Sequence, residues 1–445
     1  MARRHSVWFI AVAVGAFVGA LGVLGASAAP PATADATAVT QWNLIAVNTL
    51  TALPGPAGGA PPAAQINVGM VQGAVYDAVN AITPKHHRRP YLLQRRFGNT
   101  ASDAAAVATA AYLVLKNIVE TVPHSITFPT RETVLASLAS QYQAAKNAIP
   151  DSPFKDQGIA AGTAAAQAMI DARKGDGRFG PSQWVPNGAP GRWSLLVGQA
   201  NDPTPWAGGV KPFLMQSSSQ FRSAGPPVLT SHQYADELNE VKALGRATGS
   251  TRTDEQTYIA KWWQSTPVAS WNDVARQLIA RNHLDAADSA RLLAMQNMAA
   301  ADAAINGWND KYYFDFWRPW NAIVRASEDG NAATVADASW TALLTAPYPD
   351  HVSGHLSLDG GHTRVLQMFF GNTPAGGYQI TSGFVNPGGP ATRTFTDFSQ
   401  ALDEIVEARI WAGLHFRTAD VQARLLGTNV ANYAAANYFQ PVGNH

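Results

Sequence analysis

Apolar residues recur at three- and four-residue spacing along most of this chain, and this helical period constrains the fold more than any other feature. Val107, Ala111, Val114 and Ile118 form one such stripe. Strand-like alternation is nearly confined to a short segment at residues 378–395, which predicts a hairpin. The expected fold class is therefore all-α, made of paired helix bundles with long Gly/Pro/Trp-rich loops.

The segments with this period begin or end at Gly, Pro or polar capping residues, as helices do. The expected helices cover residues 67–82, 102–120, 130–148, 154–173, 233–244, 254–263, 271–281, 285–305, 353–370, 397–412 and 418–438. Between residues 175 and 228, Gly, Pro and Trp dominate. A loop of that length is usually functional or disordered, and its aromatic residues favour an ordered wall over a site.

Composition narrows the classes of protein. Only 14% of the residues are charged, against roughly 25% in a typical globular protein, so many helix faces must pack against other helices. The formal net charge is +1, which argues against nucleic acid as a partner. The chain has no cysteine, so disulfides contribute nothing to stability.

Residues 1–28 have the three parts of an export signal. Arg3 and Arg4 precede an apolar run at residues 7–24, and Ala26-Ser27-Ala28 provides small residues for cleavage. We expect a secreted protein with no stable membrane insertion after the signal is removed. A single retained membrane anchor is the alternative.

Lys311 and Arg318 are seven residues apart, a spacing of about two helical turns that predicts one shared helix face. Two stacked cations repel each other unless an anion lies between them. The alternative is that Asp315 neutralises both on a solvated surface. The neighbours between residues 312 and 317 are mostly aromatic, which favours a site.

Ser353-Gly354-His355 opens the helix expected at residues 353–370. Ser353 stands at the N-cap position, and an ordinary cap is the alternative interpretation. A helix start with a hydroxyl and a glycine is also suited to bind an anion through its backbone amides. His355 would then exchange a proton with that anion.

Arg409 falls in the last turn of the helix expected at residues 397–412, and Gly413 supplies the left-handed exit before His415. Arg409 could simply face the negative end of the helix dipole, and a lone histidine such as His415 is more often structural. The order of the three blocks changes these odds: Lys-x6-Arg-Pro, then Ser-Gly-His, then Arg-x5-His, all within 105 residues.

Together the three blocks resemble the signature of the vanadium-dependent haloperoxidases and type 2 acid phosphatases, the type 2 phosphatidic acid phosphatase superfamily. Trp42-Asn43, the segment 76–80 and the Gly/Pro/Trp loop resemble the long secreted bacterial haloperoxidase-like type. Val352 stands where the family usually has proline, and Asp420 lies five residues after His415 where the best-known members place an acid at four. The expected organisation is therefore a signal peptide at 1–28, an N-terminal helical half at 36–290 with its long loop at 175–228, and a haloperoxidase/acid-phosphatase catalytic core at 291–445.

The resemblance also implies a role for each matching residue. The oxygens of vanadate or phosphate would be held by Lys311, Arg318, Arg409, the Ser353 hydroxyl and the Gly354 amide. His415 would be the vanadium ligand or the phosphatase nucleophile, and His355 the general acid-base. Asp420 would orient the site, and Trp317 and Tyr348 would tune the reaction with halide and peroxide.

The implied activity is a vanadate-dependent haloperoxidase that uses hydrogen peroxide to oxidise halide, bromide and iodide rather than chloride, to hypohalous acid for a small organic acceptor. Phosphate can occupy the same site, because both anions are tetrahedral and become trigonal bipyramidal with a fifth ligand. Hydrolysis of a phosphomonoester through a phosphohistidine is therefore the alternative activity, and a non-catalytic oxyanion-binding protein is a third interpretation.

Overall fold

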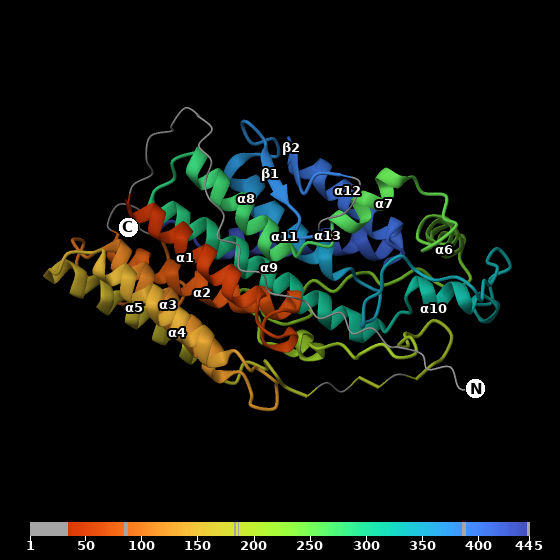
Figure 1. Ribbon diagram of the computed structural model, residues 1–445, viewed down its shortest axis with the longest axis horizontal. Coiled ribbons are helices and arrows are strands. Elements are labelled where there is room, and N and C mark those ends of the chain that lie inside the picture. Colours follow the sequence, from red (N-terminus) through yellow and green to blue (C-terminus); the bar gives the residue numbers. More distant parts are fainter. Residues whose placement is uncertain (1–33, 84–87, 182–183, 186, 385–388, 443–445) are drawn as a thin grey trace, which may run out of the picture. The chain divides into compact units, whose positions relative to one another are not determined.

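The computed structural model describes residues 34–83, 88–181, 184–185, 187–384 and 389–442. Within these ranges the regular secondary structure is helical apart from one two-stranded hairpin, which confirms the expected fold class (Figure 1). The α-helices are α1 (Ala34–Thr51), α2 (Pro61–Ile82), α3 (Asp103–Thr121), α4 (Arg131–Asn147), α5 (Pro153–Ala172), α6 (His232–Leu244), α7 (Asp254–Trp262), α8 (Pro267–Arg281), α9 (Ala286–Phe314), α10 (Pro319–Val324), α11 (Gly354–Phe370), α12 (Phe398–Trp411) and α13 (Arg417–Asn437). The hairpin strands β1 (Tyr378–Thr381) and β2 (Thr392–Phe395) are antiparallel, with Tyr378 opposite Phe395.

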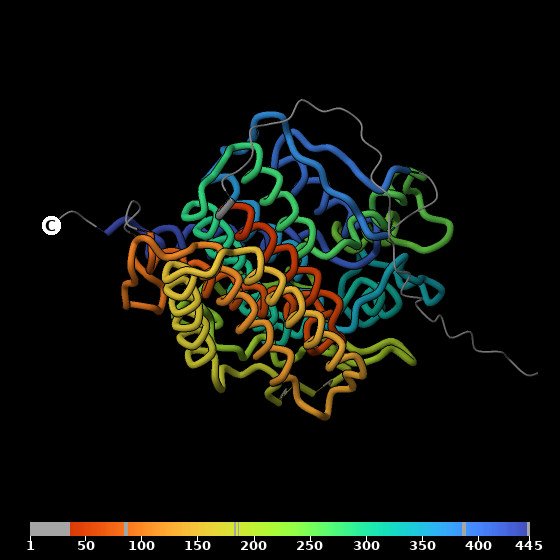
Figure 2. The backbone as a smooth tube through the Cα atoms, turned by 60° about the vertical axis from the view of Figure 1, so that its left-hand side comes forward, coloured from red at the N-terminus to blue at the C-terminus, as the bar shows by residue number. Residues whose placement is uncertain are grey.

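The helices pack in two groups that meet along α2 and α9. Helices α1 to α5 lie together, and Figure 2 shows them as the red to yellow part of the tube. Helices α9, α11 and α13 pack on one another, with α8 and α12 beside them. The described residues form one compact unit, and α9 runs across the boundary expected at residue 290, so the division into two halves stays a prediction. The expected signal at residues 1–28 lies outside the described residues.

Helices α2 and α9 are buried along most of their length and use the same device to hold the chain that packs on them. The Asp77 carboxylate on α2 accepts hydrogen bonds from the backbone amides of residues 91–93 at 2.7–3.0 Å. The Asp302 carboxylate on α9 accepts hydrogen bonds from the amides of residues 213–215 at 2.6–2.8 Å. Each buried carboxylate thus satisfies three amides that would otherwise be buried without partners.

The long loop (residues 175–228) has no α-helix among its described residues and only one 3-10 turn, η2 (Pro205–Gly209). It runs alongside α9, where the Asn306 side chain accepts a hydrogen bond from the amide of Phe221 at 2.9 Å. One turn further along α9, Asp310 accepts one from the amide of Ser223 at 2.9 Å. The loop is therefore ordered by polar side chains of α9 at one-turn intervals.

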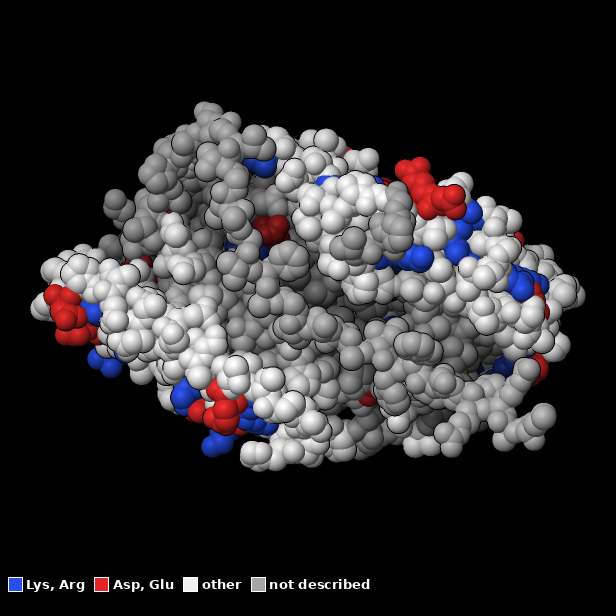
Figure 3. Space-filling model, viewed as in Figure 1, with Lys and Arg blue, Asp and Glu red and all other residues white. Residues whose placement is uncertain are grey.

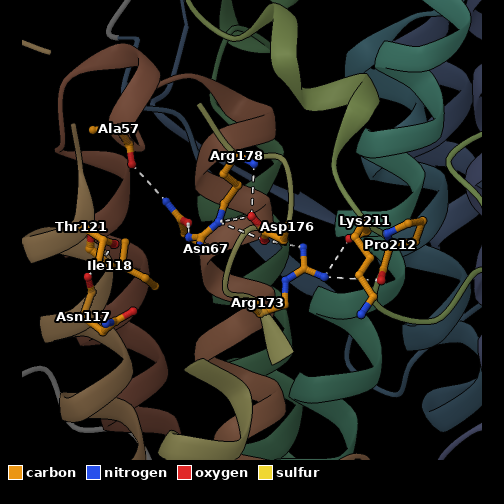
Figure 4. Close-up of polar contacts among 10 residues, drawn as sticks. All are labelled: Ala57, Asn67, Asn117, Ile118, Thr121, Arg173, Asp176, Arg178, Lys211 and Pro212. Carbon is orange, nitrogen blue, oxygen red and sulfur yellow. Dashed lines mark hydrogen bonds and ion pairs between the residues drawn. The ribbon is translucent and has the colours of Figure 1, made fainter. Parts of the chain in front are cut away.

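Two buried arginines fix the start of the long loop (Figure 4). The Asp176 carboxylate lies 2.8 Å from Arg173 Nη2 and 3.0 Å from Arg178 Nε. Arg178 also donates a hydrogen bond to the Asn67 side chain on α2, and Arg173 donates one to the Lys211 carbonyl. The cluster ties the end of α5 to α2 and to a later part of the same loop.

Charged side chains are sparse and scattered on the visible face of the molecule (Figure 3). In the described part of the chain, α3 alone is long and apolar enough by composition to cross a membrane. More than half of that helix is buried inside the fold, as expected of a core helix.

Candidate active site

Lys311 and Arg318 do not share a helix face, so that prediction was wrong. Helix α9 ends at Phe314, and the next residue, Asp315, has a left-handed backbone with φ 50°. Arg318 is the N-cap residue of the next helix, α10. The two cations come together across the break between two helices.

Pro319 cannot donate to a helical carbonyl four residues earlier, and the long loop takes over backbone hydrogen bonds that a continuing helix would make. The amide of Trp317 donates to the carbonyl of Gly191, and the amide of Trp193 donates to the carbonyl of Asp315, both at 3.0 Å. The Asp315 carboxylate accepts a hydrogen bond from the Trp184 indole at 2.8 Å. Asp315 therefore accepts hydrogen bonds from the loop and does not neutralise the two cations, as the surface alternative requires.

Both cations are fully buried, which excludes the solvated-surface alternative. Lys311 Nζ donates to the carbonyls of Pro349 and Asp350 at 2.9 and 3.1 Å. Arg318 Nε donates to the carbonyl of Tyr348 at 2.9 Å. The backbone just before Ser-Gly-His thus holds the two side chains next to each other.

Ser353 and Gly354 start α11 as expected. Ser353 is the N-cap, and its side chain accepts a hydrogen bond from the Leu356 amide. A Cβ added to Gly354 would lie 2.7 Å from ring atoms of Trp308 and 3.6 Å from Cε of Lys311. Only glycine fits at this position, and the start of the helix therefore lies directly against Lys311.

Arg409 and His415 reach the same place from the end of α12. Arg409 lies in the last turn of α12, and Gly413 has φ 72°, so the chain leaves the helix as expected. Nε2 of the buried His415 lies 3.1 Å from Nη1 of Arg318. Arg409 Nη1 donates to the carbonyl of Trp263 at 3.3 Å. We call Lys311, Arg318 and Arg409 the cation cluster.

Asp350, and not Asp420, pairs with His415, which corrects the expectation for Asp420. Oδ1 of Asp350 lies 2.8 Å from Nδ1 of His415 and 3.8 Å from Nη1 of Arg318. Asp420 lies buried in the first turn of α13, near Ser353 and Arg409, and neither of its carboxylate oxygens has a hydrogen-bond partner among the described residues. The fifth position after His415 falls inside the new helix, because α13 already begins at residue 417.

His355 has a carboxylate neighbour of its own, Asp359, one helical turn further along α11. Nε2 of His355 lies 3.6 Å from Oδ2 of Asp359. The other oxygen, Oδ1, accepts a hydrogen bond from the Trp271 indole at 2.6 Å. Each of the two site histidines is therefore next to a buried acid.

Burial dominates the electrostatics of the site. It lowers the pKa of Lys311 well below its ordinary value, and the neighbouring Arg318 lowers it further. Burial also lowers the pKa of His415, in concert with Arg318 and Lys311. It raises the pKa of Asp350 to about 7 and that of Asp420 well above its ordinary value. An anion bound among the cations would favour their charged forms and would therefore raise the pKa values that burial lowers.

Two donors in the cation cluster have no hydrogen-bond partner among the described residues: Nη2 of Arg318 and Nε of Arg409. Buried donors are normally satisfied, and an unsatisfied one costs about 1–3 kcal/mol. With the amide-bearing helix start at Gly354, they suit a tetrahedral oxyanion.

The two aromatic residues expected at the site have different surroundings. The Tyr348 ring centre lies 5.0 Å from Nζ of Lys311 and 5.2 Å from Cζ of Arg318. The fully buried Trp317 ring instead stacks 6.4 Å from Tyr234. The structure brings Tyr348 to the cation cluster, whereas Trp317 lies in the aromatic core.

The long loop also meets the site segment. Ser223 Oγ lies 2.9 Å from Nε2 of His351, the residue after Asp350. Trp184 and Trp206 of the loop line an open groove of about 630 Å³ together with Trp308 of α9. The loop therefore forms a wall along the helix that carries Lys311.

The sequence interpretation missed Asp350 and Asp359. Asp359 follows His355 by four residues, the spacing that places two side chains on one helix face, so it could have been found. Asp350 precedes Ser353 by three residues in an irregular segment, where sequence spacing gives no direction to a side chain.

Comparison with known proteins agrees with this geometry. The family described as VCPO second helical-bundle domain matches residues 291–444. The match covers about a third of the chain and supports the vanadium haloperoxidase superfamily for this segment. Every residue of the cation cluster and both site histidines lie within it, whereas Trp263 and Trp271 lie outside it.

Vanadium chloroperoxidase of Curvularia inaequalis is 26% identical to this chain over 36% of the chain, and the match spans only 32% of that relative's length. The fold is similar to the first bacterial vanadium-dependent iodoperoxidase, with TM-score 0.72, 21% identity, and coverage of 91% of this chain and 97% of that chain. It is also similar to a holo-type bacterial vanadium-dependent chloroperoxidase, with TM-score 0.67, 17% identity, and coverage of 87% and 93%. At these identities the structural likeness shows the fold of the superfamily.

Proposed function

We propose that this chain is a vanadate-dependent haloperoxidase that uses hydrogen peroxide to oxidise bromide or iodide to hypohalous acid. The observation that carries the proposal is the cation cluster, in which two of the three cations are fully buried. Donors on Arg318 and Arg409 are unsatisfied among the described residues, and Nε2 of His415 lies next to the cluster. The superfamily match of residues 291–444 supports the same activity.

The residues that would hold vanadate fit an oxyanion with one protein ligand. Lys311, Arg318 and Arg409 would neutralise its oxygens, and the helix start at Gly354 would add backbone amides. Nδ1 of His415 faces Asp350, which leaves Nε2 as the ligand atom. When bound, vanadate would activate peroxide for oxygen transfer to a halide, without a change in the vanadium oxidation state.

His355 would move the proton in this reaction. Burial and the charge of Arg409 lower its pKa well below the ordinary value, so the free ring is neutral and ready to accept a proton. The neutral ring can then take a proton from a bound oxygen and return it later in the cycle.

We further propose that the halide is bromide or iodide rather than chloride, with Tyr348 as the tuning residue, because its ring lies next to Lys311 and Arg318. A phenol can hydrogen-bond an oxygen of the bound group. The substrate partners would be hydrogen peroxide, halide and a small organic acceptor.

The decisive experiment compares two activities in one preparation. Vanadate-loaded protein should brominate a soluble phenol with peroxide, and vanadate-free protein should hydrolyse p-nitrophenyl phosphate poorly. His415→Ala should abolish bromination and keep the wild-type melting temperature. Efficient phosphate hydrolysis without bromination would favour the phosphatase instead, and vanadate binding without either activity would favour the oxyanion-binding protein.

We also propose export through the segment at residues 1–28. N-terminal sequencing of protein from the culture medium should find a start near Ala29 or Pro30. Full-length chain in the membrane fraction would instead favour the retained anchor.

A further inference from the structure

A buried polar chain leads from the N-terminal half of the molecule to His355. The indole nitrogen of Trp271, on α8, donates a hydrogen bond to Oδ1 of Asp359 at 2.6 Å. Oδ2 of Asp359 lies 3.6 Å from Nε2 of His355 and has no hydrogen-bond partner among the described residues. Trp271 precedes the segment that matches the superfamily.

We propose that Asp359, held by Trp271, is a positioning residue for His355 that turns Nε2 away from the bound oxyanion and Nδ1 towards it. The inference rests on the proposed function, because it assigns His355 as the group that moves the proton. Asp359 itself does not touch substrate and acts only through the histidine ring.

The contact between Asp359 and His355 is buried, unlike an ordinary pair of side chains one turn apart on a helix surface. The side chain of Asp359 is completely buried, and that of His355 is 11% exposed. A buried carboxylate is costly unless its oxygens are paired, and Trp271 pairs only one of them. The second oxygen lies 3.6 Å from Nε2 of His355 and has no hydrogen-bond partner among the described residues.

The geometry also explains why the acid cannot rotate freely. The Trp271 indole can only donate, so the atom of residue 359 that faces it must be an acceptor. The other carboxyl oxygen is then fixed on the side of His355. With Nε2 of the ring turned to this oxygen, Nδ1 is the nitrogen left for the oxyanion.

This constraint makes the effect of Asp359→Asn specific. The amide oxygen must face Trp271, so the amide NH2 is forced towards Nε2 of His355. Burial raises the pKa of Asp359 to about 8, so at pH 9 its carboxylate is ionised and accepts, whereas the NH2 group of Asn donates. The substitution should therefore move the ring proton of His355 from Nε2 to Nδ1 at this pH. A neutral histidine with its proton on the wrong nitrogen cannot accept one from the oxyanion.

The test has a readout that needs no vanadate. Protein labelled with 15N in its histidine rings is compared at pH 9 as wild type, Asp359→Asn and His355→Gln, the last to assign the ring. We expect the protonated nitrogen of His355 to be Nε2 in the wild type and Nδ1 in Asp359→Asn. The same tautomer in both proteins would overturn the proposal, whatever the enzyme's activity.

Kinetics of the vanadate-loaded enzyme provide the second arm. Asp359→Asn should lower kcat by about tenfold or more, with the KM for peroxide and the vanadate affinity changed less than about threefold. Trp271→Phe keeps the ring but removes the donor, so it should lower kcat in the same direction. His362→Gln, a matched control, alters another buried residue of α11 that bonds Gln65 and should leave kcat unchanged.

An equal loss in His362→Gln would show that loosening α11 alone causes the effect, and would overturn the positioning role. If wild-type protein lacks bromination altogether, the proposed function fails, whereas the tautomer measurement still decides whether Asp359 orients the ring.

Discussion

Oδ1 of Asp350 lies 2.8 Å from Nδ1 of His415, and both side chains are almost completely buried. This acid comes from the segment before Ser-Gly-His, and the histidine comes from the turn between α12 and α13. A carboxylate behind a metal-binding histidine fixes the ring orientation and the tautomer. The pair therefore joins two parts of the site that are 65 residues apart in the sequence.

Asp350→Leu should weaken vanadate binding about ten- to a hundred-fold, because the ring of His415 loses the buried acid that lies 2.8 Å from its Nδ1. Asp350→Asn keeps an acceptor and should bind within about threefold of the wild type. Isothermal titration of vanadate into the vanadate-free proteins measures both affinities, with melting temperatures as the control for folding. Equal binding by Asp350→Leu and the wild type would remove the role given to this acid.

Lys311→Met should weaken vanadate binding by about ten- to a hundred-fold. The variant keeps most of the side-chain volume but loses a buried charged donor, worth roughly 1.5–3 kcal/mol. The same titration provides the measurement. Unchanged affinity would mean that Lys311 only holds the carbonyls of Pro349 and Asp350.

Tyr348→Phe should change the ratio of bromide to chloride oxidation by about fivefold, the effect of one neutral hydrogen bond of about 1 kcal/mol. The ring stays beside Lys311 and Arg318, so vanadate affinity should be unchanged. Peroxide-dependent halogenation of one acceptor with each halide gives the ratio. Equal chloride and bromide turnover in the wild type, unaltered in the variant, would contradict both the halide order and this role.

His362→Gln should flatten the acid dependence of stability. Burial lowers the pKa of His362 to about 3, whereas the unfolded value is about 6.5. Between these two values only the unfolded chain binds the proton, so the free energy of unfolding is complete above pH 6.5 and falls by about 1.4 kcal/mol per pH unit below it. Urea unfolding at pH 7, 6 and 5 should show that the free energy of unfolding falls less with acid in the variant than in the wild type. An equal fall in both proteins would show that His362 does not cause the acid dependence.

Asp302→Ala should lower the free energy of unfolding by about 3 kcal/mol or more, because three buried amides lose their acceptor. Asp77→Ala removes the matching group on α2 and should cost a similar amount. Hydrogen exchange separates them, since the amides of residues 213–215 should exchange faster only in Asp302→Ala. Slow exchange of those amides in both variants would show that Asp302 does not hold the loop.

The helical period predicted most of the fold, because burial of one face repeats at a fixed spacing. It did not predict where α9 ends. Residues 306–314 continue the helix beyond the expected end at residue 305, and the stop at Asp315 depends on hydrogen bonds from the long loop. Pro319 signals that the helix must end before it, because it has no amide to donate to the carbonyl of Asp315, but the stop at Asp315 itself is tertiary.

The candidate site shows the same limit. The Ser353 cap and the Gly413 exit follow from local chemistry and were predicted from the sequence. The pairing of Asp350 with His415 depends on how two distant turns pack, which spacing does not encode. Asp420, which stands one residue beyond the position where the family pattern has an acid, lies near Ser353 and Arg409 instead.

The polar residues of α9 that hold the long loop also set how its length can vary. Asp302, Asn306 and Asp310 grip the loop at Met215, Phe221 and Ser223. A residue inserted between these hydrogen-bonded positions would have to form a bulge, or it would shift every later contact of the loop, including that of Ser223 with His351. Relatives should therefore gain or lose residues before position 213 far more readily than between positions 215 and 223.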